Sequence, residues 1–210
     1  MPRGTGFERA GTFAARWAVR MGLSRARVRR DAAGTSLGGD RMQIEAFTAG
    51  GIASGAVVPP WSPRDELESE QAVDLDGTTW YPLAGGAAER RGRVHLEPDE
   101  MLVLCSGEQD LPIHSAWHPV ELDLGPYRIT GELPTLPGYD PGRALSRPGG
   151  PFILIRDVRV ELLASPDAGR VERPHAFVNR YAVERVAADI DLGHFFPGAR
   201  FLTTSGRPLA

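Results

Sequence analysis

The sequence predicts an all-β protein built from two related small β domains, each barrel-like or sandwich-like. Three observations predict it: apolar residues alternate with period two along much of the chain, helix signals are few, and turn residues are frequent. Gly and Pro account for 25 and 18 of the 210 residues, which indicates short elements joined by many turns. The hydrophobic content of 41% is enough for a packed core.

Alternating apolar residues predict half-buried strands. In VELDL, Val120, Leu122 and Leu124 share one face, and the two acidic residues point the other way. The continuous apolar run Phe152–Ile155 predicts instead a strand that is covered on both faces or forms a barrel wall. The other predicted strands are MQIEAF at 42–47, TTWYPL at 78–83, EMLVLC at 100–105 and VRVELL at 158–163.

One short helical turn is expected in each half. Ser62 is a candidate N-cap with Pro63 in the first helical position, and Asp140 with Pro141 repeats this arrangement. The apolar pattern after Asp140 lasts barely one or two turns, so no long helix is expected there.

The two halves can be aligned with each other, which predicts an internal duplication. Ser54-Gly55 falls on Thr130-Gly131, 76 positions later, and a Pro-rich turn follows each pair. The differences in spacing lie in Gly-, Pro- and Ser-containing loops, where insertions cost little. The alternative is that any two β meanders with Gly-Pro turns align this loosely. The further equivalences are Leu67 with Leu145, Trp80–Leu83 with Phe152–Ile155, and Met101–Leu104 with His175–Val178.

Charge separates a basic head from an acidic body. Residues 1–41 contain nine Arg and three acidic residues, a balance of +6, whereas residues 42–210 contain fifteen Arg and 24 acidic residues, a balance of −9. The head is expected to be a disordered tail or a mispredicted extension; a basic arm and a helix docked on the body are the alternatives. The rest is predicted as a first β domain at 42–110, a linker at 111–119, a second β domain at 120–188, an aromatic segment packed on the body at 189–202 and a disordered tail at 203–210.

Composition disfavours several classes of function. An acidic body repels phosphate, so nucleic-acid binding is not expected of residues 42–210. No run of 18 apolar residues predicts a membrane span. The single Cys105 is compatible with a reducing cytoplasm, where we expect the protein to act, and it is predicted to be a buried, inert thiol. No phosphate-binding loop or nucleophile elbow is present, and neither a cofactor nor a bound metal is expected.

The second half carries a soft motif. It comprises Arg128-Ile129-Thr130-Gly131, then Phe152 to Val160 with Asp157 inside it, then Val178-Asn179-Arg180. On these residues, the segment 120–188 resembles an uncharacterised family of small bacterial β domains. The resemblance implies a compact β fold and no assigned activity. In the first half, Gly85 and Cys105 align with Asp157 and Asn179, so any chemistry of that pair would belong to the second half.

Two sets of residues are candidate binding sites. A small ligand or nucleotide could be held in the second half, although backbone capping by Asp157 and Asn179 is the alternative interpretation. The candidate ligand-binding residues are Arg128, Arg156, Asp157, Asn179 and Arg180. The C-terminal segment gathers aromatic residues that either fold back on the body or dock on a partner. The candidate partner-binding residues are Phe195, Phe196 and Phe201.

Candidate catalytic and metal-ligating residues are sparse. His114 and His118 have the i, i+4 spacing of a metal pair on a helix, but flanking prolines favour a linker instead. Asp157 with His175 is the pair to check for acid–base chemistry, and no catalytic residue is assigned. The sequence therefore predicts a non-enzymatic interaction or assembly module that binds a protein partner or a second copy. A small-ligand sensor is the alternative, and an enzyme comes last.

Overall fold

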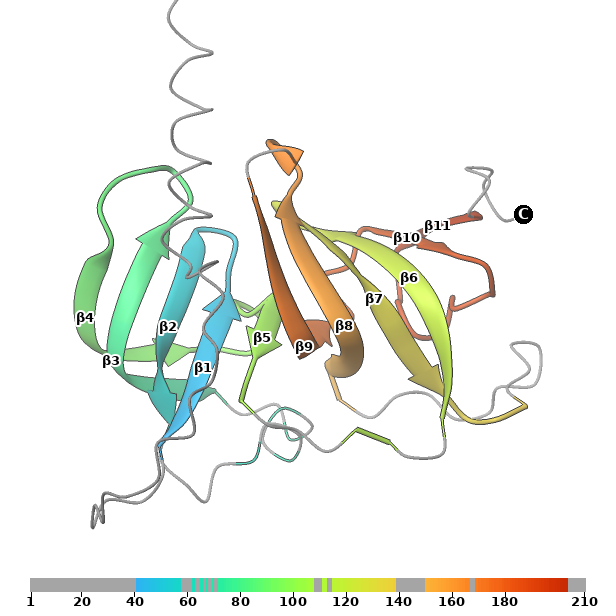
Figure 1. The fold of residues 1–210 in the computed structure, drawn as a ribbon, viewed down its shortest axis with the longest axis horizontal. Helices are drawn as coiled ribbons and strands as arrows, with labels where there is room; N and C mark the ends of the chain where they lie inside the picture. Colours follow the sequence, from blue (N-terminus) through green and yellow to red (C-terminus); the bar gives the residue numbers. More distant parts are fainter. Residues whose placement is uncertain are drawn as a thin grey trace, which may run out of the picture.

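The computed structural model describes residues 41–57, 62, 65, 67, 69, 72–107, 111–112, 115–138, 150–166 and 169–203. Eleven strands of this part form one mixed sheet (Figure 1). The strands are β1 Met42–Phe47, β2 Gly51–Val57, β3 Val73–Pro82, β4 Glu89–Leu96, β5 Val103–Cys105, β6 Ala116–Leu124, β7 Tyr127–Thr135, β8 Phe152–Leu162, β9 Arg170–Asn179, β10 Arg185–Ala188 and β11 Arg200–Thr203.

The strand order is β11-β10-β6-β7-β8-β9-β5-β1-β2-β3-β4, and among these pairs only β10 and β11 are parallel. The all-β prediction is confirmed for the described residues. The order has two ends, at β4 and β11, so it does not include the barrel closure expected from the sequence. The two predicted β domains are joined in this sheet because β5 pairs with β9, with Val103 opposite Val178 and Leu104 opposite Phe177.

Both halves have the same strand order. Strands β1 to β4 form a meander in which β5 pairs with β1, and strands β6 to β9 form a meander in which β10 pairs with β6. A register shift interrupts each meander between its second and third strands, at Gly55 and at Gly131. A Cβ at either glycine would lie 3.0 Å or less from a neighbouring atom, so the two neighbouring strands approach each other closely at both positions.

The bulges define which residues are equivalent in the two halves. Opposite Gly55 the third strand carries Gly77 with φ 61°, and opposite Gly131 it carries Asp157 with φ 51°. The sequence alignment of Gly85 with Asp157 was therefore wrong. It matched the apolar residues of β3 and β8 in a register that differs from the one set by the bulges. The match of Met101–Leu104 with His175–Val178 was wrong too: β5 pairs with β9 and has the place that β10 has in the second half.

Gly77 offers a test of backbone strain without a steric clash. A Cβ at this position would meet nothing within 4 Å, yet its φ lies in the left-handed region. We expect Gly77→Ala to lower the free energy of unfolding by about 1 kcal/mol, and Gly77→Asp by less, because Asp tolerates this conformation. Urea unfolding of both variants checks the order, which an equal loss in both would contradict.

Among the described residues, the core consists of two apolar clusters, and each draws residues from both halves. The larger cluster includes Tyr127 together with Phe47, whose ring meets it edge-on at 5.5 Å. The smaller cluster consists mainly of first-half residues and adds Phe152 and Phe177 of the second half. Along β8, Phe152 and Leu154 contact the smaller cluster, and Ile153 and Ile155 belong to the larger one. Of the two alternatives predicted for this apolar run, the fold has the strand that is covered on both faces.

The predicted connections are described only in part. The turn at 140–146 lies outside the described residues. In the first half, Ser69 N donates to Asp65 O at 3.2 Å, as in a single helical turn. The linker predicted at 111–119 ends earlier than expected, because Ala116–Pro119 form the start of β6. In this part of β6, Nε2 of His118 lies 2.9 Å from the hydroxyl oxygen of Thr135. His114 lies outside the described residues.

The C-terminal aromatic segment folds back onto the body. Phe196 is fully buried in the larger cluster, and Phe195 and Phe201 pack against it partly buried. Phe201 belongs to β11, the strand at one end of the sheet. Of the two alternatives for this segment, the fold has the first. Phe196 is consequently a core residue and is not exposed to a partner. Thr203, predicted as the first residue of the tail at 203–210, is instead the last residue of β11, and residues 204–210 lie outside the described residues.

Candidate functional site

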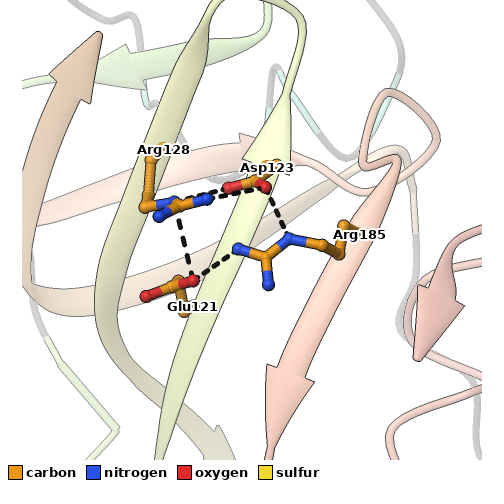
Figure 2. A network of polar contacts seen from close by, with 4 residues as sticks. All are labelled: Glu121, Asp123, Arg128 and Arg185. Atoms are coloured by element: carbon orange, nitrogen blue, oxygen red, sulfur yellow. Dashed lines mark hydrogen bonds and ion pairs between the residues drawn. The ribbon is translucent and has the colours of Figure 1, made fainter. Parts of the chain in front are cut away.

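The predicted ligand residue Arg128 belongs to an ion-pair network on the outer face of β6, β7 and β10 (Figure 2). Its Nε and Nη2 donate to the Asp123 carboxylate at 2.8 and 3.1 Å. Arg185 Nε donates to the same carboxylate at 2.5 Å, and Arg185 Nη2 donates to Glu121. Carboxylates of β6 thus bind both arginines. This network, which we call the clamp, joins β6 to β7 and to β10.

Asp123 makes the clamp sensitive to acid. Burial raises the pKa of its carboxyl group, but hydrogen bonds from Arg128 and Arg185 outweigh that effect and hold the pKa below its ordinary value of 3.8. A lowered folded-state pKa contributes stability above the unfolded value, and this contribution is lost as pH falls through the folded value. We expect Asp123→Asn to be less stable than wild type at pH 7 and to lose less stability between pH ~4 and pH ~2. Urea midpoints across this range test the expectation, and parallel pH curves would contradict it.

Arg156 lies in a separate cluster on β7 and β8. Its Nε and Nη2 donate to Glu132 at 2.7 and 2.5 Å, and its guanidinium carbon lies 4.0 Å from the centre of the Trp117 ring. Asp157 is next to it, 3.6 Å from Arg156 Nε, with 75% of its side chain exposed. Glu132 and Arg128 are four positions apart on β7, which is about 13 Å along a strand.

Asn179 and Arg180 lie at the end of β9 and have local partners. Asn179 Nδ2 donates to the Pro98 and Met101 carbonyls at 3.1 and 3.2 Å, and its Oδ1 accepts from Tyr181 N at 3.1 Å. Arg180 is buried and donates from Nη2 to the His194 carbonyl at 2.9 Å. The capping alternative therefore fits Asn179, which ties this turn to the first half.

The five predicted ligand residues thus do not converge on one pocket. They divide into three groups spread along β7, β8 and the end of β9. A shallow hollow of about 400 Å³ adjoins Asp157, but its arginines have carboxylate partners: Arg159 Nε lies 3.5 Å from Glu172, and Arg173 binds Glu45. The lining residues are Asp157, Val158, Arg159, Glu172, Arg173 and Pro174.

Burial shifts the pKa of titratable groups in the described interior, His175 and Cys105 among them. It lowers the pKa of His175, whose Nε2 lies 3.4 Å from the Ser106 hydroxyl. Burial raises the pKa of the Cys105 thiol to about 12, which disfavours the reactive thiolate. The prediction that this cysteine is buried is confirmed, and its inertness stays a prediction. Asp157 is exposed and contacts Arg156, so the structure shows no bond that joins it to His175.

The edge strand β4 is the feature that sequence reasoning missed. It stands at one end of the strand order and pairs with β3, from Val73 opposite Leu96 to Trp80 opposite Glu89 (Figure 1). All five residues of Glu89–Arg93 are exposed, so neither face of this stretch is covered by the part of the chain that the structure describes. The available signal was the sequence ERRGR itself, which has no apolar residue to bury and is typical of a charged edge strand.

Exposed ion pairs line one face of β3 and β4. Arg91 Nη2 lies 2.8 Å from Glu89 and its guanidinium carbon 4.7 Å from the Trp80 ring centre, and Arg93 Nε lies 3.2 Å from Asp76. His95 bridges Asp74 at 2.9 Å and Glu97 at 3.1 Å. Hydrogen bonds to these two carboxylates raise the pKa of His95.

Comparisons with known proteins do not indicate a functional site in this chain. No protein-family model, no curated protein and no solved structure matches the chain. The resemblance of 120–188 to small bacterial β domains therefore stays a prediction. Within the described residues, no cluster of three or more His, Cys, Asp or Glu side chains is arranged to hold a metal ion. The same part of the chain has no helix with the length and hydropathy needed to cross a membrane.

Proposed function

We propose that this protein is a non-enzymatic interaction or assembly module that binds an extended segment of its partner along the edge of β4. The observation that carries this proposal is the exposure of Glu89–Arg93 on both faces at one end of the sheet. The outer edge of such a strand presents backbone N–H and C=O groups that can pair with another strand. A partner strand could approach there without displacing any described element.

The opposite end of the sheet is a poorer acceptor. β11 has four residues, against eight in β4. A longer edge offers more backbone hydrogen bonds to an added strand, so β4 is the favoured edge. A cytoplasmic location, where the free Cys105 would stay reduced, is part of this proposal.

The proposal includes an origin of the sheet by duplication. Support comes from the shared strand order and from the equivalent bulges at Gly55 and Gly131. In such a pair of repeats, β4 is the counterpart of β9, and β9 pairs with β5 at Phe177 and Val178. The free edge of β4 is then the position at which a further strand would continue the pattern.

Site-directed photo-crosslinking tests the proposed function. Gly92 and Gly107 are both exposed, and a Cβ at either would meet nothing within 4 Å. A photo-reactive phenylalanine derivative at Gly92 in the full chain should yield a discrete adduct in the native host, either with one protein or with a second copy. The derivative at Gly107 is the matched control. Identical products from both positions, or none from Gly92, would overturn the proposal.

A further inference from the structure

We propose that the segment that binds β4 is acidic, an inference that rests on the function proposed above. β4 contains Arg90, Arg91 and Arg93 against the single acidic Glu89, a balance of +2. The body around it, residues 42–210, has a balance of −9. The strand itself is thus basic on an acidic protein, although Asp74, Asp76 and Glu97 pair with its side chains on one face. Complementary charge on the strand would select the partner.

The arginines on one face can exchange their carboxylate partners. The side chains of Arg91 and Arg93 are 44% and 68% exposed, and those of Glu89 and Asp76 are 54% and 36% exposed. Ion pairs this exposed are held weakly, so carboxylates of an added strand can compete with those of the protein. The arginines lie two positions apart, and side chains of an extended partner repeat on one face at the same interval.

Arg90 extends the basic strip to the other face of the strand. It lies opposite Thr79 and is exposed, and no carboxylate pairs with it among the described residues. An acidic side chain of a bound strand would find this guanidinium without breaking an existing ion pair. Arg90 therefore binds acidic side chains of the partner on the face of β4 opposite to that of Arg91 and Arg93.

A second copy fits this edge less well than an acidic segment. Antiparallel self-pairing of β4 centred on Gly92 places Arg91 opposite Arg93 of the other copy. Like charges directly across a strand pair are destabilising, so the arginines act against self-association in this register. Centres at Arg90 or Arg91 place that residue opposite its own equivalent, but they also place Glu89 opposite Arg91 or Arg93 of the other copy.

A peptide titration of the full-length protein, read by amide chemical shifts, tests the inference. The probes are peptides of about ten residues that alternate Glu with Thr, or Lys with Thr, and a Glu/Thr peptide N-methylated at alternate amides. We expect the Glu/Thr peptide to shift β4 resonances and to bind at least about tenfold more tightly than the Lys/Thr peptide. The double variant Arg90→Glu with Arg93→Glu should reverse that preference.

Arg200→Glu is the matched control, because Arg200 is an exposed arginine on the edge strand at the other end of the sheet. It should bind the Glu/Thr peptide like wild type. Equal affinity for both charges, binding of neither, or an unchanged preference in a folded double variant would overturn the acidic partner. Those results would leave the proposed function standing if Gly92 still crosslinks. Equal binding of the N-methylated peptide would instead contradict strand addition itself.

Discussion

Replacing Tyr127 with Ala should lower the free energy of unfolding by about 3–5 kcal/mol, the largest loss expected from a single substitution in this protein. Tyr127 belongs to the second half and is fully buried against Phe47 of the first. Its hydroxyl donates to the Thr48 carbonyl at 3.0 Å. The substitution therefore opens a cavity where the two halves meet and removes a hydrogen bond between them. Chemical unfolding measures the loss.

Tyr127→Phe separates the two contributions. It retains the ring against Phe47 and removes only the donor to the Thr48 carbonyl, so we expect a loss of about 1–2 kcal/mol. Leu75→Ala is a control for cavity formation within the smaller cluster. If Tyr127→Ala cost no more than Tyr127→Phe, the packing between the halves described above would be wrong.

Replacing Arg173 with Met should cost about 2 kcal/mol, the second large effect. Arg173 Nε and Nη2 donate to Glu45 at 2.7 and 2.8 Å, which joins β9 of the second half to β1 of the first. Their side chains are 25% and 23% exposed, so the pair lies between a surface ion pair, worth about 0–1 kcal/mol, and a buried one, whose disruption costs about 3–5 kcal/mol. Removal of one partner leaves the other charge uncompensated.

A double-mutant cycle with Glu45→Gln tests this account. The double variant should lose less stability than the sum of the two single variants, because neither charge is then left alone. Arg170→Met is the matched control on the same strand: its partner Glu172 is 3.0 Å away, but both side chains are more than half exposed. We expect about 0.5 kcal/mol or less from it. If the losses of stability in the cycle of Glu45 and Arg173 were additive, a coupling between β1 and β9 through this ion pair would be contradicted.

Local patterns in the sequence predicted some strands and missed others, among them β2 and the edge strand β4. Alternation in MQIEAF matched the bounds of β1, and the apolar run from Phe152 predicted a strand covered on both faces or a barrel wall, of which the fold has the first. The alignment of Ser54-Gly55 with Thr130-Gly131 matched the two positions at which the fold has a bulge, although no bulge was predicted there. Glycine is needed at both because two strands approach closely at that point. Matching β3 to β8 by apolar runs failed, since period-two patterns match in several registers.

Long-range pairing could not be predicted from the sequence. Alternation placed Glu121 and Asp123 on the outer face, but nothing indicated that Arg185, 62 positions after Asp123, would clamp them. Arg128, Arg156 and Asn179 drew attention as a ligand site because they share a motif. In the fold, strand geometry separates them, and each has its own partner. The pairing of β5 with β9, which makes one sheet of two halves, also has no local signal.

Residue-resolved hydrogen–deuterium exchange of the full-length protein tests the free edge of β4 most directly. Amides that pair with β3 are protected, and those that point away from it are open to solvent if the edge is free. We expect alternating slow and fast exchange along Glu89–Leu96. We also expect the fast amides to slow when the Glu/Thr peptide is added. Uniform protection along β4 in the protein alone would show that another segment or a second copy already covers this edge, and would contradict the proposed interface.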